Sequence, residues 1–212
     1  MKNILVFLSL AAGFAACDTS SKWKPSKEVM EQGDRYKGLS AYSKKVMQYR
    51  DSTSAMFLSG ANGVLEKKDL SPTGRLKYFA PDEAFRVAAT FAPIQNGEVL
   101  KMETSTDRRP EYKRFGTFSF KLGDADLVLT LYQNVEQPEY LFCPFKDLTN
   151  GAVTYGAGRY LDFALADLEN PVLDFNYAYN PYCAYNHEYS CPIPPSENHL
   201  KVPIPAGEKK WH

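Results

Sequence analysis

Alternating hydrophobic and polar positions dominate the middle of the chain and predict a series of short strands. Residues 84–91 and 112–122 alternate with a period of two, and an apolar run at 127–133 follows the turn Gly123-Asp124. Such spacing is typical of half-buried strands joined by tight turns. We predict strands over residues 76–80, 84–91, 99–104, 112–122, 127–133, 140–145, 153–163 and 172–175, and an edge strand over 199–204.

Two turn sequences predict how these strands pair. Asn96-Gly97 is a strong hairpin signal and predicts that strands 84–91 and 99–104 pair directly. Gly123-Asp124 predicts a second hairpin. A chain of short strands joined in this way is expected to form a mainly β domain, an antiparallel β-barrel or sandwich.

The two ends of the chain depart from the strand pattern. Tyr42, Val46 and Tyr49 recur at spacings of three and four, which predicts an N-terminal helical arm over residues 39–57 that packs on the domain, with Ser40 as its N-cap. Residues 171–208 hold six aromatic residues and seven prolines. This composition predicts an ordered, non-regular C-terminal segment, because proline restricts the backbone without secondary structure.

The first residues have the pattern of an export signal. Lys2 precedes a short apolar run at residues 4–10, and small residues lead to Cys17. This resembles the lipobox of bacterial lipoproteins and implies cleavage before Cys17 and lipid on its thiol. The alternative is an ordinary secretory signal with a cysteine nearby by chance. The expected organisation is a lipoprotein signal peptide (1–16), a tether (17–26) and a single β-rich domain with an N-terminal helix (27–212).

Composition and charge limit the partners. The chain is 44% hydrophobic and 24% charged, as in globular domains, and its formal net charge is zero. It therefore has no electrostatic footprint for nucleic acid. We expect it on the periplasmic or outer-membrane side of the cell envelope, attached to the membrane through the lipid on Cys17.

The remaining cysteines allow several interpretations. Cys183 and Cys191 are close enough in sequence to form a disulfide, which an exported protein permits. With His187 and His199 they form the spacing C-x3-H-x3-C-x7-H, which matches no standard zinc pattern, so we expect no metal and no cofactor. A cysteine nucleophile with a histidine base is an alternative. Cys143 lies in an apolar run and is expected to be a core thiol.

Polar residues in the last third are candidate ligand contacts. Arg159 falls within a predicted strand, where a guanidinium needs a carboxylate, a carbonyl or an anionic ligand. A structural pair with Asp162 or Asp174 would also satisfy it. Asn176 and Asn180 could orient a ligand or satisfy local amides.

Two stretches resemble the domain of unknown function 1684 family. They are FKDLTNGAVTYGAGRYLD and LDFNYAYNPYCAYNHEYSCPIPPSENHLKVPIPAGE, and weaker similarity extends the likeness to about residues 45–209. The resemblance implies that the family pattern includes, among others, Arg159, Tyr160, Asp174, Asn176, Asn180, Cys183, Cys191 and Asn198. His187 and His199 fall outside this pattern. No activity comes with the family.

These observations favour a lipid-anchored envelope protein of unknown function that binds a small ligand or an envelope partner through Arg159 and the segment 174–183. The ligand-binding candidates are Arg159, Tyr160, Asp174, Asn176, Asn180, Cys183 and Asn198. The alternative is a cell-envelope enzyme, hydrolase-like or thiol-dependent, that uses the same region. An acid pair of Asp174 and Glu197 is one form of that alternative.

Overall fold

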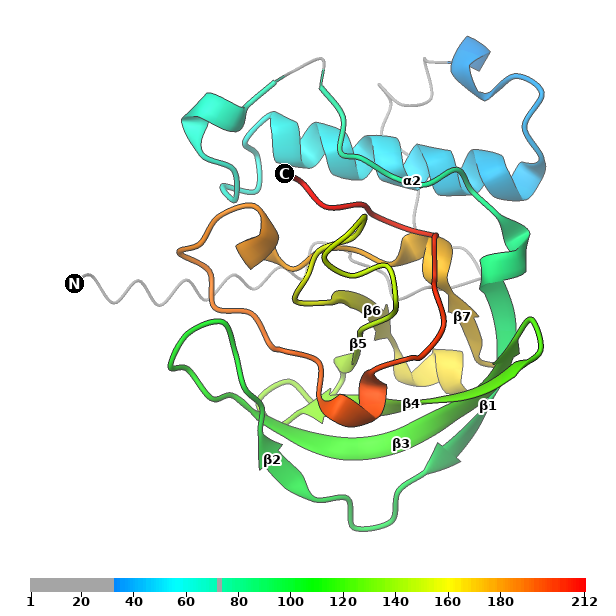
Figure 1. Cartoon of the computed structure of the whole chain (residues 1–212), viewed down its shortest axis with the longest axis vertical. Helices are drawn as coiled ribbons and strands as arrows, with labels where there is room; N and C mark the ends of the chain where they lie inside the picture. The colour runs from blue at the N-terminus through cyan, green and yellow to red at the C-terminus, as the bar shows by residue number, and fades with distance from the viewer. Residues whose placement is uncertain (1–32, 72–73) are drawn as a thin grey trace.

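In the residues that the structure describes, the fold is one strongly curled antiparallel sheet with one α-helix laid across its open side (Figure 1). The computed structural model describes residues 33–71 and 74–212. Within these ranges the strand order is β6-β5-β4-β3-β1-β7, and β2 also pairs with β3. The strands are β1 (Arg86–Pro93), β2 (Val99–Lys101), β3 (Glu111–Leu122), β4 (Ala125–Asn134), β5 (Leu141–Phe145), β6 (Arg159–Phe163) and β7 (Val172–Asp174).

The sheet is a half-barrel. The fold is therefore a single open sheet, where the sequence predicted a barrel or a sandwich. The predicted mainly β, antiparallel class is confirmed. β3 and β4 form the longest pairing, joined by the predicted turn at Gly123-Asp124, and Leu122 lies opposite Ala125. The register shifts between Arg114 and Gly116, and a bulge of this kind increases local twist and bends the sheet.

The hairpin predicted at Asn96-Gly97 is wrong. β1 and β2 both pair with β3, where Pro93 lies opposite Gly116 and Val99 opposite Lys113. The two strands therefore follow one another along the same edge of β3. Gly97 is needed because a Cβ there would lie 1.8 Å from the carbonyl oxygen of Arg114. The turn signal reflected this close approach and a positive φ of 52° at Asn96.

Three other predicted strands are shorter than expected or absent. Residues 76–80 form only an isolated bridge, between Tyr78 and Glu208. The prediction over 153–163 holds only for β6, because residues 151–158 form turns. Residues 199–204 form no strand and contribute one parallel bridge, from His199 to Lys146.

The helix α2 (Ala41–Leu58) begins at the predicted cap, where the Ser40 hydroxyl accepts a hydrogen bond from the backbone N–H of Ser43. Apolar contacts through Phe57 and Leu58 hold one end of the helix. Arg50 holds its middle: the buried guanidinium donates to the carbonyl oxygens of Phe79 (2.6 Å) and Asn176 (2.9 Å). The helix is thus attached to the domain by apolar packing and by a buried cation.

The concave face of the sheet is filled by the C-terminal segment. One core cluster joins strand residues such as Phe118, Leu129 and Phe145 to later residues of the chain, which include Phe175, Ala178, Leu200, Ile204 and Ala206. The segment itself is built from short turns and extended stretches, and it lies inside the curve of the sheet (Figure 1). Across residues 33–71 and 74–212, no helix is both long and apolar enough to span a membrane.

Candidate functional site

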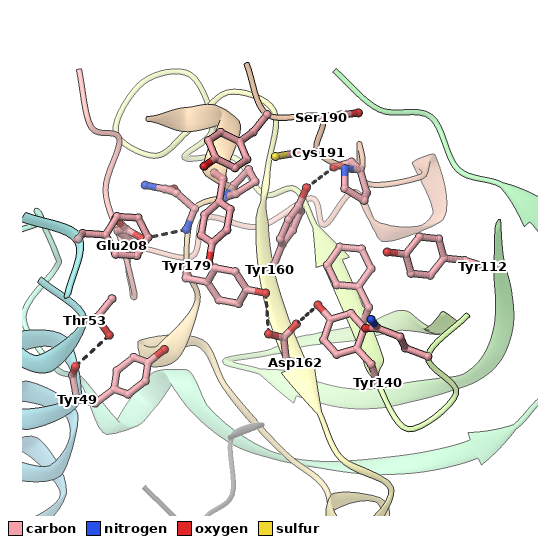
Figure 2. A pocket seen from close by; sticks show the side chains of 18 residues that line it. Tyr49, Thr53, Tyr112, Tyr140, Tyr160, Asp162, Tyr179, Ser190, Cys191 and Glu208 are labelled. Carbon is pink, nitrogen blue, oxygen red and sulfur yellow. Dashed lines mark hydrogen bonds between the residues drawn. The ribbon is translucent and has the colours of Figure 1, made fainter. Parts of the chain in front are cut away.

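A cavity of about 370 Å³ lies between the helix, the C-terminal segment and one end of the sheet. Its volume is within the usual range for a small-molecule site. Three walls supply the lining. α2 contributes Tyr49, Thr53 and Phe57; the sheet and the loop before β5 contribute Tyr112, Gln137, Tyr140, Phe142, Tyr160 and Asp162; the C-terminal segment contributes residues 179–182, 189–192 and Glu208. Figure 2 shows these side chains around the central Asp162.

Asp162 is held between two tyrosines. The hydroxyl of Tyr140 donates to Oδ1 at 2.8 Å, and that of Tyr179 donates to Oδ2 at 2.7 Å (Figure 2). Burial raises the pKa of Asp162 to about 6, and the two tyrosine hydrogen bonds lower it in part. The carboxyl is therefore mainly ionised at pH 7 but can take up a proton slightly below neutrality.

Aromatic rings cover much of the wall beside this carboxyl. Phe142 and Tyr160 meet edge to face with ring centroids 4.6 Å apart, and Tyr160 and Tyr179 meet at 90° with centroids 5.7 Å apart. Tyr112 also packs on Phe142, with ring centroids 5.5 Å apart. The hydroxyl of Tyr160 donates to the carbonyl oxygen of Pro192, so strand β6 and the C-terminal segment are joined across the cavity wall.

Glu208 provides a second carboxyl at the wall. It is buried and accepts hydrogen bonds from the backbone N–H of Asn180 at 2.9 Å and from the hydroxyl of Tyr185. Burial raises the pKa of Glu208 to about 7. The site thus contains two carboxyls that titrate near neutrality in an aromatic environment.

The two late cysteines lie side by side next to the cavity. The backbone N–H of Cys183 donates to Sγ of Cys191 at 3.1 Å, and Cys191 lines the cavity. Both are free and buried, as is Cys143, which lies in the core as expected. A hydrogen bond with Cys191 lowers the pKa of Cys183 to about 6, and the same interaction raises that of Cys191. The predicted disulfide stays a prediction, and the proximity it needs is present.

Arg159 lies in the interior, away from the cavity lining. Its side chain is fully buried and forms an ion pair with Asp147 at 2.8 Å. It also donates to the backbone carbonyl oxygens of Ile204 (2.9 Å) and Ala206. Its partner is Asp147 rather than the predicted Asp162 or Asp174. The guanidinium therefore ties the end of the chain to β6.

Three further candidates have their polar atoms committed to the protein. Asp174 accepts from the hydroxyl of Tyr42 (2.9 Å) and from Nδ2 of Asn176 (3.1 Å). Asn176 also bridges to the backbone of Asp82. Asn198 is fully buried; its amide accepts from the N–H of Thr130 and donates to the carbonyl oxygens of Thr130 and Pro144.

Only part of the predicted set comes together. Tyr160 and Asn180 line the cavity, and Cys183 lies beside it through its contact with Cys191. Sequence reasoning missed Asp162 and Glu208 as site residues. A signal for Asp162 existed, because it lies two positions after Tyr160 on β6 and so shares its face.

The arrangement does not favour two other site types. Asp174 and Glu197 share no partner: Asp174 contacts Tyr42 and Asn176, whereas Glu197 contacts Arg114 (2.8 Å) and Tyr132 (2.7 Å). Among the described residues, no three His, Cys, Asp or Glu side chains are grouped closely enough to hold a metal ion.

The protein is thus a curled single sheet whose concave face is filled by the C-terminal segment of the same chain. The chain belongs to the DUF1684 family, described as proteins of unknown function, and matches it over residues 74–209. The helix α2 precedes the matched range. The chain is also similar to an uncharacterized protein of Haloarcula marismortui solved by solution NMR. The two are 31% identical over 87% of this chain and 97% of that one, with a TM-score of 0.61. No curated protein matches the sequence.

Proposed function

We propose that this DUF1684 protein binds a small ligand in the tyrosine-lined cavity around Asp162. The observation that carries the proposal is the cavity itself, about 370 Å³, with aromatic walls and the Asp162 carboxyl in its lining. Sites for small molecules are usually concave and mostly apolar, with a few convergent polar groups. This site replaces the one predicted around Arg159, because Tyr160 and Asn180 line the cavity and Arg159 does not.

Filling the cavity from the helix wall tests this function. Thr53→Trp places an indole where Thr53 lines the cavity, whereas Ala55→Trp places one at an exposed position two residues along the same helix. Phenol, a small neutral aromatic, is the probe, and its binding is followed by amide chemical-shift changes of the full chain. We expect shifts at Tyr160, Tyr179 and Cys191 in the parent and in Ala55→Trp, and their loss in Thr53→Trp. Shifts scattered over the surface, or an unchanged response in Thr53→Trp, would contradict the proposal.

We also propose that the protein is a bacterial lipoprotein of the cell envelope, anchored by lipid on Cys17. The support is the sequence of residues 1–17, which lies outside the described residues. Several acyl chains on one residue give stable anchoring, whereas a single chain is marginal. Cys17→Ser is expected to abolish labelling by a palmitate analogue and to release the protein from the membrane fraction, while Thr19→Ser leaves both unchanged. Membrane retention of unlabelled Cys17→Ser would contradict the anchor.

A thiol-dependent enzyme is the second candidate, and one observation favours it. The hydrogen bond with Cys191 lowers the pKa of Cys183, which favours its thiolate over that of an ordinary cysteine. Thiolates are the reactive form of cysteine. Iodoacetamide should then modify Cys183 faster than Cys143, whose pKa burial raises. Equal, slow modification of both would argue against a reactive thiol.

A further inference from the structure

The hydrogen-bond donors around Asp162 are already used by the protein. The hydroxyls of Tyr140 and Tyr179 donate to Asp162, and that of Tyr160 donates to the carbonyl oxygen of Pro192. The hydroxyl of Thr53 donates to the backbone of its own helix at 3.1 Å. These hydroxyl hydrogens are therefore not available to a ligand.

Hydrogen-bond acceptors, in contrast, have capacity left. Each oxygen of Asp162 receives one tyrosine hydroxyl, and a carboxylate oxygen can accept about two hydrogen bonds. The Glu208 oxygens likewise each receive one described donor, from Asn180 and Tyr185. At Asp162 and Glu208 a ligand thus meets acceptors, and a ligand group that donates is recognised best there.

The charged residues of the cavity lining favour a cationic ligand. In the part of the chain that the structure describes, the cavity lining includes the carboxyls of Asp162 and Glu208 and no lysine, arginine or histidine. An anionic ligand would find no counter-charge, whereas a cation would neutralise a carboxyl that burial disfavours. The electrostatic environment therefore selects against anions and for cations.

The rings give the cation a second kind of contact. Tyr160 lies perpendicular to Tyr179 and nearly perpendicular, at 79°, to Phe142. Neighbouring rings at right angles present both faces and edges to the space beside Asp162 (Figure 2). An ammonium group over an aromatic face is attracted by the ring quadrupole, and the attraction is strongest where water is excluded.

We propose that the ligand of this cavity is a small organic ammonium ion, with its charged head at Asp162 and its apolar part among the tyrosine rings. The proposal rests on the proposed function and narrows it to one ligand class. The acceptor capacity left on the two carboxyls, the aromatic walls and the absence of basic residues from the described lining support it.

A matched pair of probes tests the charge. Benzylamine is protonated at pH 7.5 and benzyl alcohol is a neutral molecule of nearly the same shape. Calorimetric titration of the full chain is expected to give a Kd for benzylamine at least about tenfold lower than for benzyl alcohol, because a desolvated cation gains contacts that a hydroxyl does not. Asp162→Asn should weaken benzylamine binding by about tenfold or more and change benzyl alcohol binding by less than about twofold.

The control is Asp126→Asn, which removes an exposed carboxylate that pairs with Lys121 outside the cavity. It should leave both affinities unchanged. Equal or tighter binding of benzyl alcohol would overturn the ammonium proposal while leaving a ligand-binding cavity in place. An equal loss of benzylamine affinity in Asp126→Asn would also overturn it, since the effect would then come from net charge. If neither probe shifts the amides of Tyr160 and Tyr179, both this proposal and the proposed function fail.

Discussion

Replacing Arg159 by methionine is expected to destabilise the fold strongly, because the guanidinium serves the interior. The substitution keeps a long apolar side chain and removes every donor. It leaves Oδ2 of Asp147 without its ion-pair partner and the carbonyl oxygen of Ala206 without the guanidinium donor, whereas the carbonyl oxygen of Ile204 keeps its bond from the N–H of Ala206. Asp147 Oδ1 keeps its bonds from Thr149 and from the N–H of Ile204.

The magnitude follows from burial. Both side chains of the Arg159–Asp147 pair are fully shielded from solvent, and breaking such a pair from one side costs about 3–5 kcal/mol. A domain of this size has a free energy of unfolding of about 5–15 kcal/mol. With a urea dependence of about 2 kcal/mol per molar, the unfolding midpoint should fall by about 2 M.

Urea unfolding monitored by circular dichroism measures this loss. The control is Arg114→Met, because Arg114 pairs with Glu98 and Glu197 while its side chain is 31% exposed. Surface pairs are worth about 0–1 kcal/mol, so this midpoint should move little. Arg159→Lys keeps the charge but loses the fork of donors, so its unfolding midpoint should lie between those of the parent protein and Arg159→Met.

Two results would refute this account of Arg159. One is a loss of stability in Arg159→Met no larger than in Arg114→Met. The other is a stable Arg159→Lys protein that no longer binds a probe in the cavity, because that would make Arg159 a ligand contact. If Arg159→Met does not fold, Arg159→Lys still separates the two roles.

Other positions give further expectations. Gly207→Ala should lower the free energy of unfolding by more than about 2 kcal/mol, roughly twice or more the loss in Gly123→Ala. The reason is that φ is positive at both glycines, but only at Gly207 would a Cβ lie 2.6 Å from carbonyl oxygens. The pKa of Asp162 is raised to about 6, so the folded state binds the proton of this carboxyl more tightly than the unfolded state does. The free energy of unfolding should therefore rise as the pH falls from 6 to 4. The rise should be smaller in Asp162→Asn. If Cys183 and Cys191 form the disulfide, the denatured, unreduced Cys17→Ser protein should show one reactive thiol, Cys143, and three after reduction. Three reactive thiols before reduction would exclude the disulfide.

Local features of the fold could be predicted because they depend on neighbouring residues. The Ser40 cap, the helix and the Gly123 turn each involve contacts within a few positions, and all three are present. Asn96-Gly97 shows the limit of such signals. A sequence that favours a tight turn also suits a kink between two strands that share one partner, and only the position of β3 distinguishes these cases.

The candidate site was harder to predict because its polar residues act over long distances in the sequence. Asn198 looks like a ligand residue in an irregular segment. Its side-chain amide instead bonds both the N–H and the carbonyl oxygen of Thr130, 68 positions earlier, as a neighbouring strand would. Arg159 reaches a carboxylate 12 residues before it and carbonyl groups more than 40 residues after it. Hydrophobic periodicity shows which face a residue occupies but does not identify its partner. Within the aromatic-rich segment 171–208, residues 179–182, 189–192 and Glu208 line the cavity.

The way the C-terminal segment fills the sheet determines when the protein can fold. Phe175, Leu200, Ile204 and Ala206 belong to the same core cluster as Phe118 and Leu129. A growing chain therefore has the strands β1–β4 long before it has the later side chains that cover their inner face. Contacts between such distant positions slow folding, because the intervening chain must first be closed into a loop. We infer that the core of the sheet, and with it the cavity, closes only after residues 200–206 can reach the strands.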